Sequence, residues 1–354
     1  MTEVIIIGAG LAGLTAAYRL KKSEIPFRVV EARDRIGGRI HTLSGPIEMG
    51  ATWFGSQHIH LRQFLTELEV ENFEQFTKGK ISYDLHPQAP AQYMEMPAGQ
   101  APSYRIKGGT TSLINRLVSE LDPKQIQLNT SIESIHDKGG VLLIKDKGNQ
   151  EYQASLIIST IPPQLMANVI TFEPALPAAT QKLMSETHTW MGESIKFALS
   201  YTRPFWKENG FSGMGFAQTG VIEEIHDHSN AEETFFSLKG FLRTDLSELT
   251  RSEREQLVKA QVVKLFGPEA ADYIGYQDRV WIDEEYTSVK SVTPLMPHQN
   301  NGHPELNQPL MNQKLLIAGT ESSPVYGGYM EGAVYAGTKA AQQVERLLKT
   351  TQSS

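Results

Sequence analysis

Cysteine does not occur anywhere in the 354 residues of this chain. Without thiols the protein can form no disulfide, no thiolate metal site and no cysteinyl bond to a cofactor. Long apolar runs are missing too, because no stretch approaches the roughly 20 residues that a helix needs to span a bilayer. The first apolar run, Val4 to Gly13, lacks a basic leader. We therefore expect no cleaved signal peptide, no membrane association and a cytoplasmic location.

Basic residues are in the minority: 33 lysines and arginines stand against 40 acidic residues, which leaves a formal net charge of −7. This balance favours solubility and provides no electrostatic footprint for nucleic acid, so we expect no nucleic-acid partner. Hydrophobic residues make up 40% of the chain, enough for a substantial core, and the length suggests about two domains. These features leave the oligomeric state open.

A glycine-rich turn near the start lies between a predicted strand that ends at Ile7 and a predicted helix from about Leu11 to Lys22. A second predicted strand, Phe27 to Glu31, follows the helix. The turn has the spacing GxGxxG and consists of Gly8-Ala9-Gly10-Leu11-Ala12-Gly13. Its glycines permit a tight turn and close approach to a pyrophosphate, and Glu31 can accept hydrogen bonds from ribose hydroxyls. The unit predicts dinucleotide binding without distinguishing NAD from FAD.

A basic, glycine-containing segment follows this acid: Glu31-Ala32-Arg33-Asp34-Arg35-Ile36-Gly37-Gly38-Arg39. An arginine guanidinium in such a loop can fork onto phosphate oxygens. Here the chain resembles the flavin monoamine oxidase family, which includes polyamine oxidases and the lysine-specific histone demethylases. The resemblance implies that Ala32, Arg33, Gly38 and Arg39 support the diphosphate of FAD.

The resemblance continues through most of the chain. Gly50-Ala51-Thr52 is similar to the family segment whose backbone passes the flavin ring, and Ile132 is similar to the adenine contact. The most specific match is the closing pair of motifs, Ala318-Gly319-Thr320-Glu321 and Gly327-Gly328-Tyr329-Met330-Glu331-Gly332-Ala333. It implies cofactor contacts from Gly319, Glu321, Gly328, Tyr329 and Met330. It also implies that a helix N-terminus points at the flavin pyrimidine edge, where negative charge accumulates on reduction.

Two side chains carry the expected chemistry. Lys196 is similar to the family lysine that holds a water at flavin N5, and an ammonium in an otherwise apolar strand is costly to bury without such a purpose. Tyr329 resembles one wall of the aromatic cage that orients the amine and keeps it desolvated, which favours the neutral, oxidisable form. We expect both residues to be catalytic.

The sequence also departs from the family pattern. Lys290 stands where the covalent enzymes have cysteine, and Ser291 stands where they have the second cage tyrosine. FAD should therefore be bound non-covalently, and Tyr326 or Trp53 are candidates for the missing wall. The segment 77–103 is shorter than the insertion that relatives carry there. This shortening predicts a pocket that is more open or covered by a partner.

The predicted fold class is α/β, with a Rossmann-like FAD/NAD(P)-binding domain of the glutathione-reductase type and a discontinuous α+β substrate domain. Residues 1–76, 104–162 and 283–354 are assigned to the FAD-binding domain, and residues 77–103 and 163–282 to the substrate domain. In the substrate domain the expected strands at 195–201 and 234–241 look comparatively exposed.

Metal binding is not expected. The pairs His58/His60 and His226/His228 lack a helical i, i+4 spacing and an evident third ligand, so they are interpreted as surface or loop histidines. The acidic run from Glu223 to Glu233 is interpreted as an exposed loop.

The expected activity is oxidation of a small amine to an imine by hydride transfer to flavin N5, with dioxygen as the acceptor that reoxidises the flavin. Two alternatives remain open. Carotenoid desaturases and protoporphyrinogen oxidases share the early glycine and arginine motifs but would not need Lys196 or Tyr329. The truncated substrate region also admits a non-catalytic FAD-binding module that acts with a partner.

Overall fold

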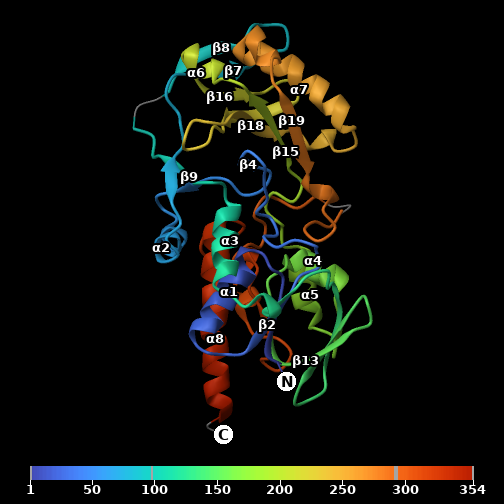
Figure 1. Ribbon diagram of the computed structural model, residues 1–354. Coiled ribbons are helices and arrows are strands. Elements are labelled where there is room, and N and C mark those ends of the chain that lie inside the picture. The colour runs from blue at the N-terminus through green and yellow to red at the C-terminus, as the bar shows by residue number, and fades with distance from the viewer. Residues whose placement is uncertain (1, 97–98, 291–293, 353–354) are drawn as a thin grey trace.

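The computed structural model describes residues 2–96, 99–290 and 294–352. These residues form two lobes, each built around its own large β-sheet (Figure 1). Both chain ends lie at the lower end of the view, in the same lobe, while the middle of the chain builds most of the upper lobe. The first and last segments of the sequence therefore fold together.

The lower lobe is organised on a mainly parallel sheet. Its strands are β1 (Thr2–Ile7), β2 (Phe27–Val30), β10 (Ile126–Gln127), β11 (Ile132–Asp137), β12 (Leu142–Asp146), β13 (Glu151–Ser159), β14 (Thr171–Glu173) and β20 (Leu315–Ile317). They follow the order β10-β2-β1-β13-β12-β11-β14, and β20 pairs with β13 outside this path. β1 is parallel to β2 and β13, and β20 is parallel to β13. Strands from both ends of the chain thus share one α/β sheet.

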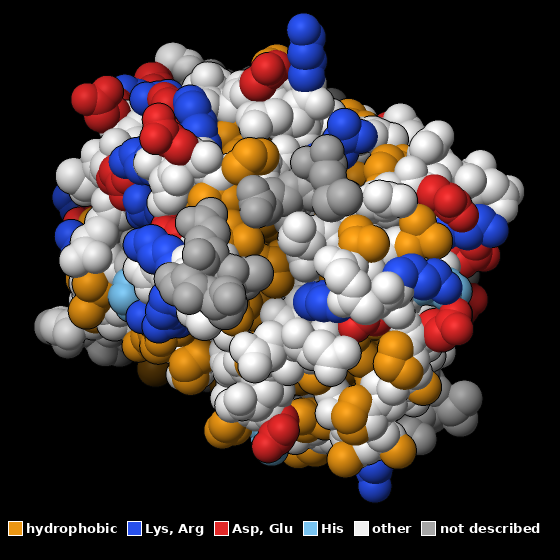
Figure 2. All heavy atoms as spheres, turned by 90° about the horizontal axis from the view of Figure 1, so that it is seen from below, with side chains coloured by type: hydrophobic (Ala, Val, Ile, Leu, Met, Phe, Trp, Pro, Cys, Tyr) orange, Lys and Arg blue, Asp and Glu red, His pale blue; other side chains and the backbone are white. Residues whose placement is uncertain are grey.

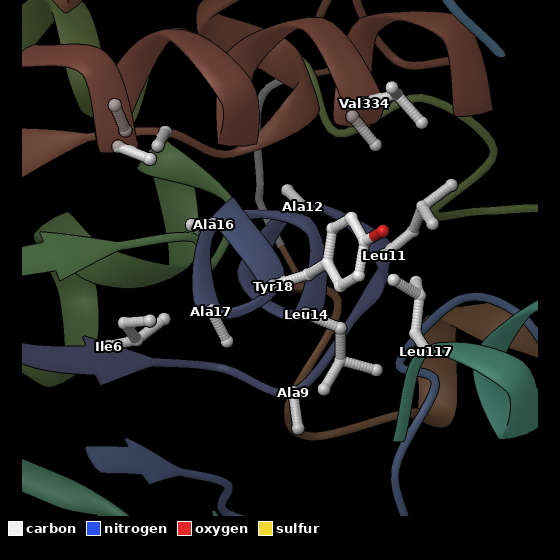
Figure 3. Close-up of a cluster of buried hydrophobic side chains, with 14 of the residues drawn as sticks. Ile6, Ala9, Leu11, Ala12, Leu14, Ala16, Ala17, Tyr18, Leu117 and Val334 are labelled. Carbon is white, nitrogen blue, oxygen red and sulfur yellow. The ribbon is translucent and has the colours of Figure 1, made fainter. Parts of the chain in front are cut away.

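Three helices cover one face of this sheet: α1 (Leu11–Lys22), α3 (Thr111–Ser119) and α8 (Met330–Gln352) among the described residues. Figure 3 shows Ala12 of α1 on the side toward α8, where Val334 lies, and Leu117 of α3 beside Leu14. The helices α1 and α8 approach closely because Gly337 has no side chain, since a Cβ there would lie 2.3 Å from the Ala12 carbonyl oxygen. This contact fixes the C-terminal helix on the N-terminal motif.

The opposite face of the sheet is covered by a segment that was assigned to the other lobe. Helices α4 (Pro163–Val169) and α5 (Ala178–Ser185) bury Met166 and Met184 against β-strand residues such as Ile157. Between the helices, β14 pairs with β11. The predicted domain boundary at residue 163 therefore differs from the sheet pairing. The proline pair ends a strand there but does not carry the chain out of the lobe.

The upper lobe contains a mostly antiparallel sheet with the strand order β19-β15-β18-β17-β16-β7-β8. Its strands are β7 (Lys80–Asp84), β8 (Gln92–Glu95), β15 (Ile195–Tyr201), β16 (Phe211–Ala217), β17 (Ile222–Asp227), β18 (Phe236–Leu242) and β19 (Gly275–Val280). Every residue of β15 is buried, contrary to the exposed strand expected from the sequence. Both faces are covered: α6 (Phe205–Glu208) and α7 (Arg251–Phe266) contribute to the core on one side, and segments of the lower lobe contact the other.

Small elements connect the lobes: β3 (Thr42–Leu43), β4 (Ile47–Glu48), β5 (Phe54–Gly55), α2 (Ile59–Glu67), β6 (Asn72–Glu74) and β9 (Ser103–Ile106). β5, β9 and β6 form a separate short sheet. Figure 1 shows β4 between the lower lobe and the second sheet. Viewed from below, the surface carries basic and acidic side chains on the same face (Figure 2).

We expect Gly13→Ala to destabilise the protein by about 1–3 kcal/mol, the range typical of overpacking. A Cβ at this position would lie 2.0 Å from the carbonyl oxygen of Gly8, so α1 would have to move away from the glycine turn. The midpoint of thermal unfolding should fall. Gly140→Ala is the matched control, because a Cβ at Gly140 meets nothing within 4 Å. Equal midpoints for the two variants would contradict the packing argument.

Candidate functional site

A cleft runs through the lower lobe at the carboxyl ends of β1, β2 and β13. Of the predicted cofactor residues, these line it: Gly8, Gly10, Leu11, Ala12, Glu31, Ala32, Arg33, Gly38, Arg39, Ala51, Ile132, Gly328, Tyr329 and Met330. The fold thus brings residues from both ends of the chain to one cavity.

The glycine turn gives the cleft a floor of bare backbone. Gly8 has a φ of +103°, a conformation that favours glycine, and a Cβ there would lie 2.7 Å from the Thr160 hydroxyl oxygen. Gly10 forms a β-bridge with Gly37 and precedes the first residue of α1. The helix N-terminus therefore opens toward the cleft, where its free amides favour an anionic group.

Glu31 is held at the end of β2 by main-chain donors. Its carboxylate oxygens accept hydrogen bonds from the amides of Ala9, at 2.7 Å, and Arg33, at 3.0 Å. The residue is 4% exposed. These bonds tie the glycine turn to the arginine segment. They also fix the Glu31 side chain at the wall of the cleft.

The two arginines predicted to contact phosphate have different partners. Arg33 donates to the Thr287 hydroxyl at 2.7 Å and lies 3.5 Å from the Glu284 carboxylate. Arg39 forks onto Glu321, with nitrogen–oxygen distances of 2.6 and 3.0 Å. Glu321 is fully buried. Arg39 thus connects the first dinucleotide motif with the last one while its side chain remains partly exposed toward the cleft.

Several predicted residues do not line the cleft: Gly13, Gly50, Thr52, Gly319, Glu321 and Lys196. Sequence reasoning missed other lining residues: Ile7, Val30, Gly37, Ile40, Thr130, Ser131, Thr160, Ile161, Pro162, Leu165, Val169, Ile170, Tyr286, Thr287, Thr320 and Ala333. A signal existed for Thr160, because it directly follows a buried strand of the predicted parallel sheet, where ligands of such sheets bind. No comparable pattern marks Tyr286 and Thr287.

Lys196 projects from β15 toward the lower lobe and is 5% exposed. Its Nζ atom donates a hydrogen bond of 2.6 Å to the carbonyl oxygen of Gly50 and lies 5.1 Å from the centre of the Phe241 ring. Burial lowers the pKa of Lys196 to about 8, against the opposing attraction of the Glu48 and Glu224 carboxylates. The structure therefore places Lys196 at the 50–52 segment.

A second buried lysine, which the sequence did not single out, lies beside it. Lys239 of β18 is fully buried, donates to the Thr52 hydroxyl, and lies 4.4 Å from the centre of the Trp53 ring. Burial, followed by the charge of Lys196, holds the pKa of Lys239 well below its usual value. Nothing in the sequence separates Lys239 from the surface lysines of a strand, because its burial results from the packing of the two lobes.

Tyr329 belongs to a cluster of rings at the start of α8. Ring centroids of Trp190 and His298 lie 5.7 and 5.5 Å from it, and that of Tyr326 lies 6.3 Å away at nearly a right angle. Trp53 lies elsewhere, 5.0 Å from the His226 ring. Trp190 was not predicted, although it lies only six residues before Lys196.

Of the two positions that depart from the family pattern, the structure describes one. Lys290 is largely exposed and forms an ion pair of 2.9 Å with Asp283. Ser291, where the second cage tyrosine was expected to be missing, lies outside the described residues.

A second cavity lies against the second sheet, and Trp53 forms part of its lining. Its lining residues are Trp53, Glu74, Gln75, Thr77, Met96, Gly99, Gln100, Ala101, Pro102, Ser103, Met214, Glu224 and His226. Its described lining residues include two carboxylates and neither lysine nor arginine. The side chain of His226, 3.7 Å from Glu224, lowers the pKa of that carboxyl group. The cavity therefore carries negative charge next to an aromatic ring.

Two sequence expectations about this region are wrong. The run Glu223 to Glu233 is not an exposed loop, since β17 includes residues 222–227 and Asp227 is fully buried. His228 is not a surface histidine, because it is 1% exposed and its Nε2 atom accepts a hydrogen bond of 3.1 Å from the backbone amide of Glu48. His58 is likewise buried, against the ring of Tyr326. Contacts with Glu48 of β4 and Arg105 of β9 accompany the burial of His228.

The described residues contain no group of three or more His, Cys, Asp or Glu side chains arranged to hold a metal ion. Within the same described ranges, no helix combines the length and apolar character needed to cross a membrane.

Comparison with known proteins identifies the family. The family of flavin-containing amine oxidoreductases matches residues 11–102 and 89–345, which is most of the chain. The protein therefore belongs to this family. It is an FAD-dependent amine oxidase, as the motifs predicted.

Two curated relatives show how far the sequence of this chain has diverged from those of other members of the family. The probable flavin-containing monoamine oxidase A of Dictyostelium discoideum is 24% identical over 450 residues, covering 97% of this chain and 97% of that protein. Flavin-containing amine oxidase B of Mus musculus is 24% identical and is matched over 97% of this chain and 86% of its own length. Since the alignment with the first is longer than the 354 residues here, that relative carries insertions absent from this chain.

Solved structures show the same fold. Cyclohexylamine oxidase from Brevibacterium oxydans IH-35A superimposes with a TM-score of 0.87 at 24% identity, covering 98% of this chain and 99% of that one. Wild-type putrescine oxidase bound to putrescine gives a TM-score of 0.85 at 20% identity, covering 98% and 99%. The predicted Rossmann-like FAD-binding domain with an added substrate domain is thereby confirmed.

The residues of the cleft fit FAD on physical grounds. The glycine floor, the free amides at the start of α1 and the nearby guanidinium of Arg33 suit a diphosphate, and Glu31 suits a ribose. No cysteine exists in the chain to form a thioether with the cofactor.

We expect Glu321→Gln to lower stability by about 1–3 kcal/mol, the usual size of a hydrogen bond to a charged group. The amide cannot accept both guanidinium bonds that Arg39 now donates. Thermal unfolding of the variant should therefore begin at a lower temperature. Glu71→Gln serves as the control because its ion pair with Lys107 is exposed, and surface pairs contribute little. Indistinguishable midpoints for the two variants would refute a structural role for the Arg39–Glu321 pair.

Proposed function

We propose that the protein oxidises a small amine to an imine, that the amine α-carbon gives up a hydride to N5 of FAD, and that dioxygen takes up the two electrons. When bound, FAD supplies the two-electron acceptor. The imine then adds water and releases an aldehyde together with ammonia or a smaller amine. The observation that carries the proposal is the buried ammonium of Lys196 on the Gly50 carbonyl, at the junction of the two lobes.

In this proposal the dinucleotide lies along the cleft, with Glu31 at a ribose, Arg33 and the glycine turn at the diphosphate, and Ile132 at the adenine. Gly328, Tyr329 and Met330 at the start of α8 would then lie at the ring end, where the helix N-terminus favours negative charge. The assignment is supported by the presence of all of these residues on one cavity wall.

Lys196 would hold a water molecule at the reacting face and keep it oriented, because its nitrogen is already fixed by Gly50. Tyr329, together with Trp190, would present an apolar surface to the substrate and keep the amine desolvated. Desolvation disfavours the ammonium form, and only the neutral amine can release a hydride.

The second cavity is proposed as the side from which the amine arrives. Its carboxylates, Glu74 and Glu224, attract a protonated amine from solvent, and Trp53 separates the cavity from the buried lysines. The amine would lose its proton as it moves from this acidic region toward Lys196, where the local charge is positive.

Anaerobic rapid mixing of the FAD-loaded protein with a panel of monoamines, diamines and amino acids tests the proposed function. We expect at least one amine to bleach the flavin absorbance, and readmitted dioxygen to restore it. Bleaching by a polyene or a porphyrinogen with no response to amines would instead favour a desaturase-like reaction. Flavin that no donor reduces would favour a non-catalytic module.

We expect Lys196→Met to retain FAD but to slow flavin reduction by about 100-fold, the effect typical of a misplaced reacting group. The wild-type rate should also change near pH 8, because Lys196 is charged below its lowered pKa of about 8 and neutral above it. This change should be absent from the variant. Lys264→Met is the control, since Lys264 pairs with Asp84 on the far side of the upper lobe. Unchanged reduction kinetics in Lys196→Met would remove Lys196 from the mechanism.

A further inference from the structure

The two buried lysines are joined by a continuous chain of hydrogen bonds. Lys239 donates to the hydroxyl of Thr52, and that hydroxyl donates to the carbonyl oxygen of Gly50 at 3.1 Å. Lys196 donates to the same carbonyl oxygen at 2.6 Å. The Gly50 carbonyl oxygen thus accepts hydrogen bonds from both Thr52 and Lys196. A change at Lys239 can therefore reach Lys196 through the Thr52 hydroxyl and the Gly50 carbonyl.

Strand register places both lysines on one face of the second sheet. Lys196 is opposite Phe241 on β18, and Lys239 lies two residues before Phe241 on the same strand. Side chains two residues apart on a strand point to the same face. The Phe241 ring lies 5.1 Å from the Lys196 nitrogen and 5.8 Å from the Lys239 nitrogen. The two ammonium groups therefore share an aromatic neighbour as well as the hydrogen-bonded segment.

The charged groups that face Lys239 come from every element around it. Lys196 of β15 and Arg105 of β9 contribute like charges, while Glu48 of β4 and Glu224 of β17 contribute opposite ones. Among the described residues, no carboxylate comes within ion-pair distance of the nitrogen of Lys239 or of Lys196. A fully buried lysine without a direct counter-ion is costly, and such residues are concentrated at functional sites.

We infer that Lys239 is a positioning residue of the oxidation site, which acts through Thr52 and Gly50 to fix the nitrogen of Lys196. Lys239 also contacts Trp53, so it holds the whole segment 50–53 between the two lobes. This segment carries the only route of direct hydrogen bonding between the two lysines in the described part of the chain. The expected effect on the rate of flavin reduction rests on the proposed function. The expected coupling between the ionisations of the two lysines does not.

The kinetic test compares Lys239→Met, Lys239→Arg and Thr52→Val in the FAD-loaded protein with an amine that reduces the wild type. We expect Lys239→Met to slow flavin reduction by about 10-fold with little change in amine affinity, because orientation is lost and binding is not. Thr52→Val should do the same, since it interrupts the chain at its middle. Lys239→Arg, which keeps a cationic donor, should recover part of the rate. Lys264→Met should reduce flavin at the wild-type rate.

A double-mutant cycle identifies the route. If Lys239 acts through Thr52, adding Lys239→Met to Thr52→Val should slow the reaction by less than about twofold more. Effects that multiply, or a Lys239→Met variant that reduces flavin at the wild-type rate, would overturn the inference. Should Lys239→Met fail to fold, Thr52→Val and Lys239→Arg still decide between coupled and independent action.

The second readout needs no amine. The visible spectrum of the bound flavin is recorded against pH, because ionisation of nearby lysines changes its environment. Two interacting ammonium groups titrate as a pair, and the first ionisation of the pair lies below that of either group alone. We therefore expect the first spectral transition to move to higher pH in Lys239→Met and to stay near its wild-type position in Lys239→Arg. An unmoved transition in Lys239→Met would refute the coupling. If no amine reduces the flavin but the first spectral transition still moves in Lys239→Met, only the proposed function would be refuted.

Discussion

The ion pair between Arg39 and Glu321 is the interaction on which the arrangement of the cleft depends. It joins the loop after the first βαβ unit to the loop before the last helix, and its carboxylate is completely buried. A buried carboxylate without its guanidinium would be strongly unfavourable, so the two loops must come together for either to be stable. The cleft proposed to hold the dinucleotide is lined by Arg39 and by Thr320, which precedes Glu321.

The contact made by a segment of the lower lobe also determines which side chains of the upper lobe are buried. The segment 50–53 leaves the lower lobe and lies against the second sheet, where Lys196 and Lys239 both bond to it. Neither lysine would be buried on an isolated sheet. The chemistry proposed for Lys196 therefore arises at the contact between the lobes.

The parts of this structure that follow from local sequence patterns were predictable. The turn at Gly8 and the closing motif at Gly328 need φ angles of +103° and +90°, which favour glycine, and the helix from Leu11 begins where its apolar periodicity predicted. Lys196 was found because its strand and the following motif are specific. The packing of distant segments was not predictable, because burial is decided by the partner and not by the strand itself.

Three examples illustrate this limit. Lys239 is the one charged residue of an otherwise mostly apolar strand, and His228 lies in a polar stretch that resembles a loop; both are buried where segments of the lower lobe contact them. Likewise β14 follows a proline pair that marks a boundary in the sequence, yet it pairs with β11. Such pairings over long sequence separation leave no periodic trace in either segment.

The most direct test of this account is titration of FAD into the purified, cofactor-free protein, followed by absorbance and by thermal unfolding. We predict that each chain binds a single FAD, turns yellow and unfolds at a higher temperature, because a ligand that binds only the folded state stabilises it. A folded protein that stays colourless and whose unfolding temperature is unaffected by FAD would contradict the account.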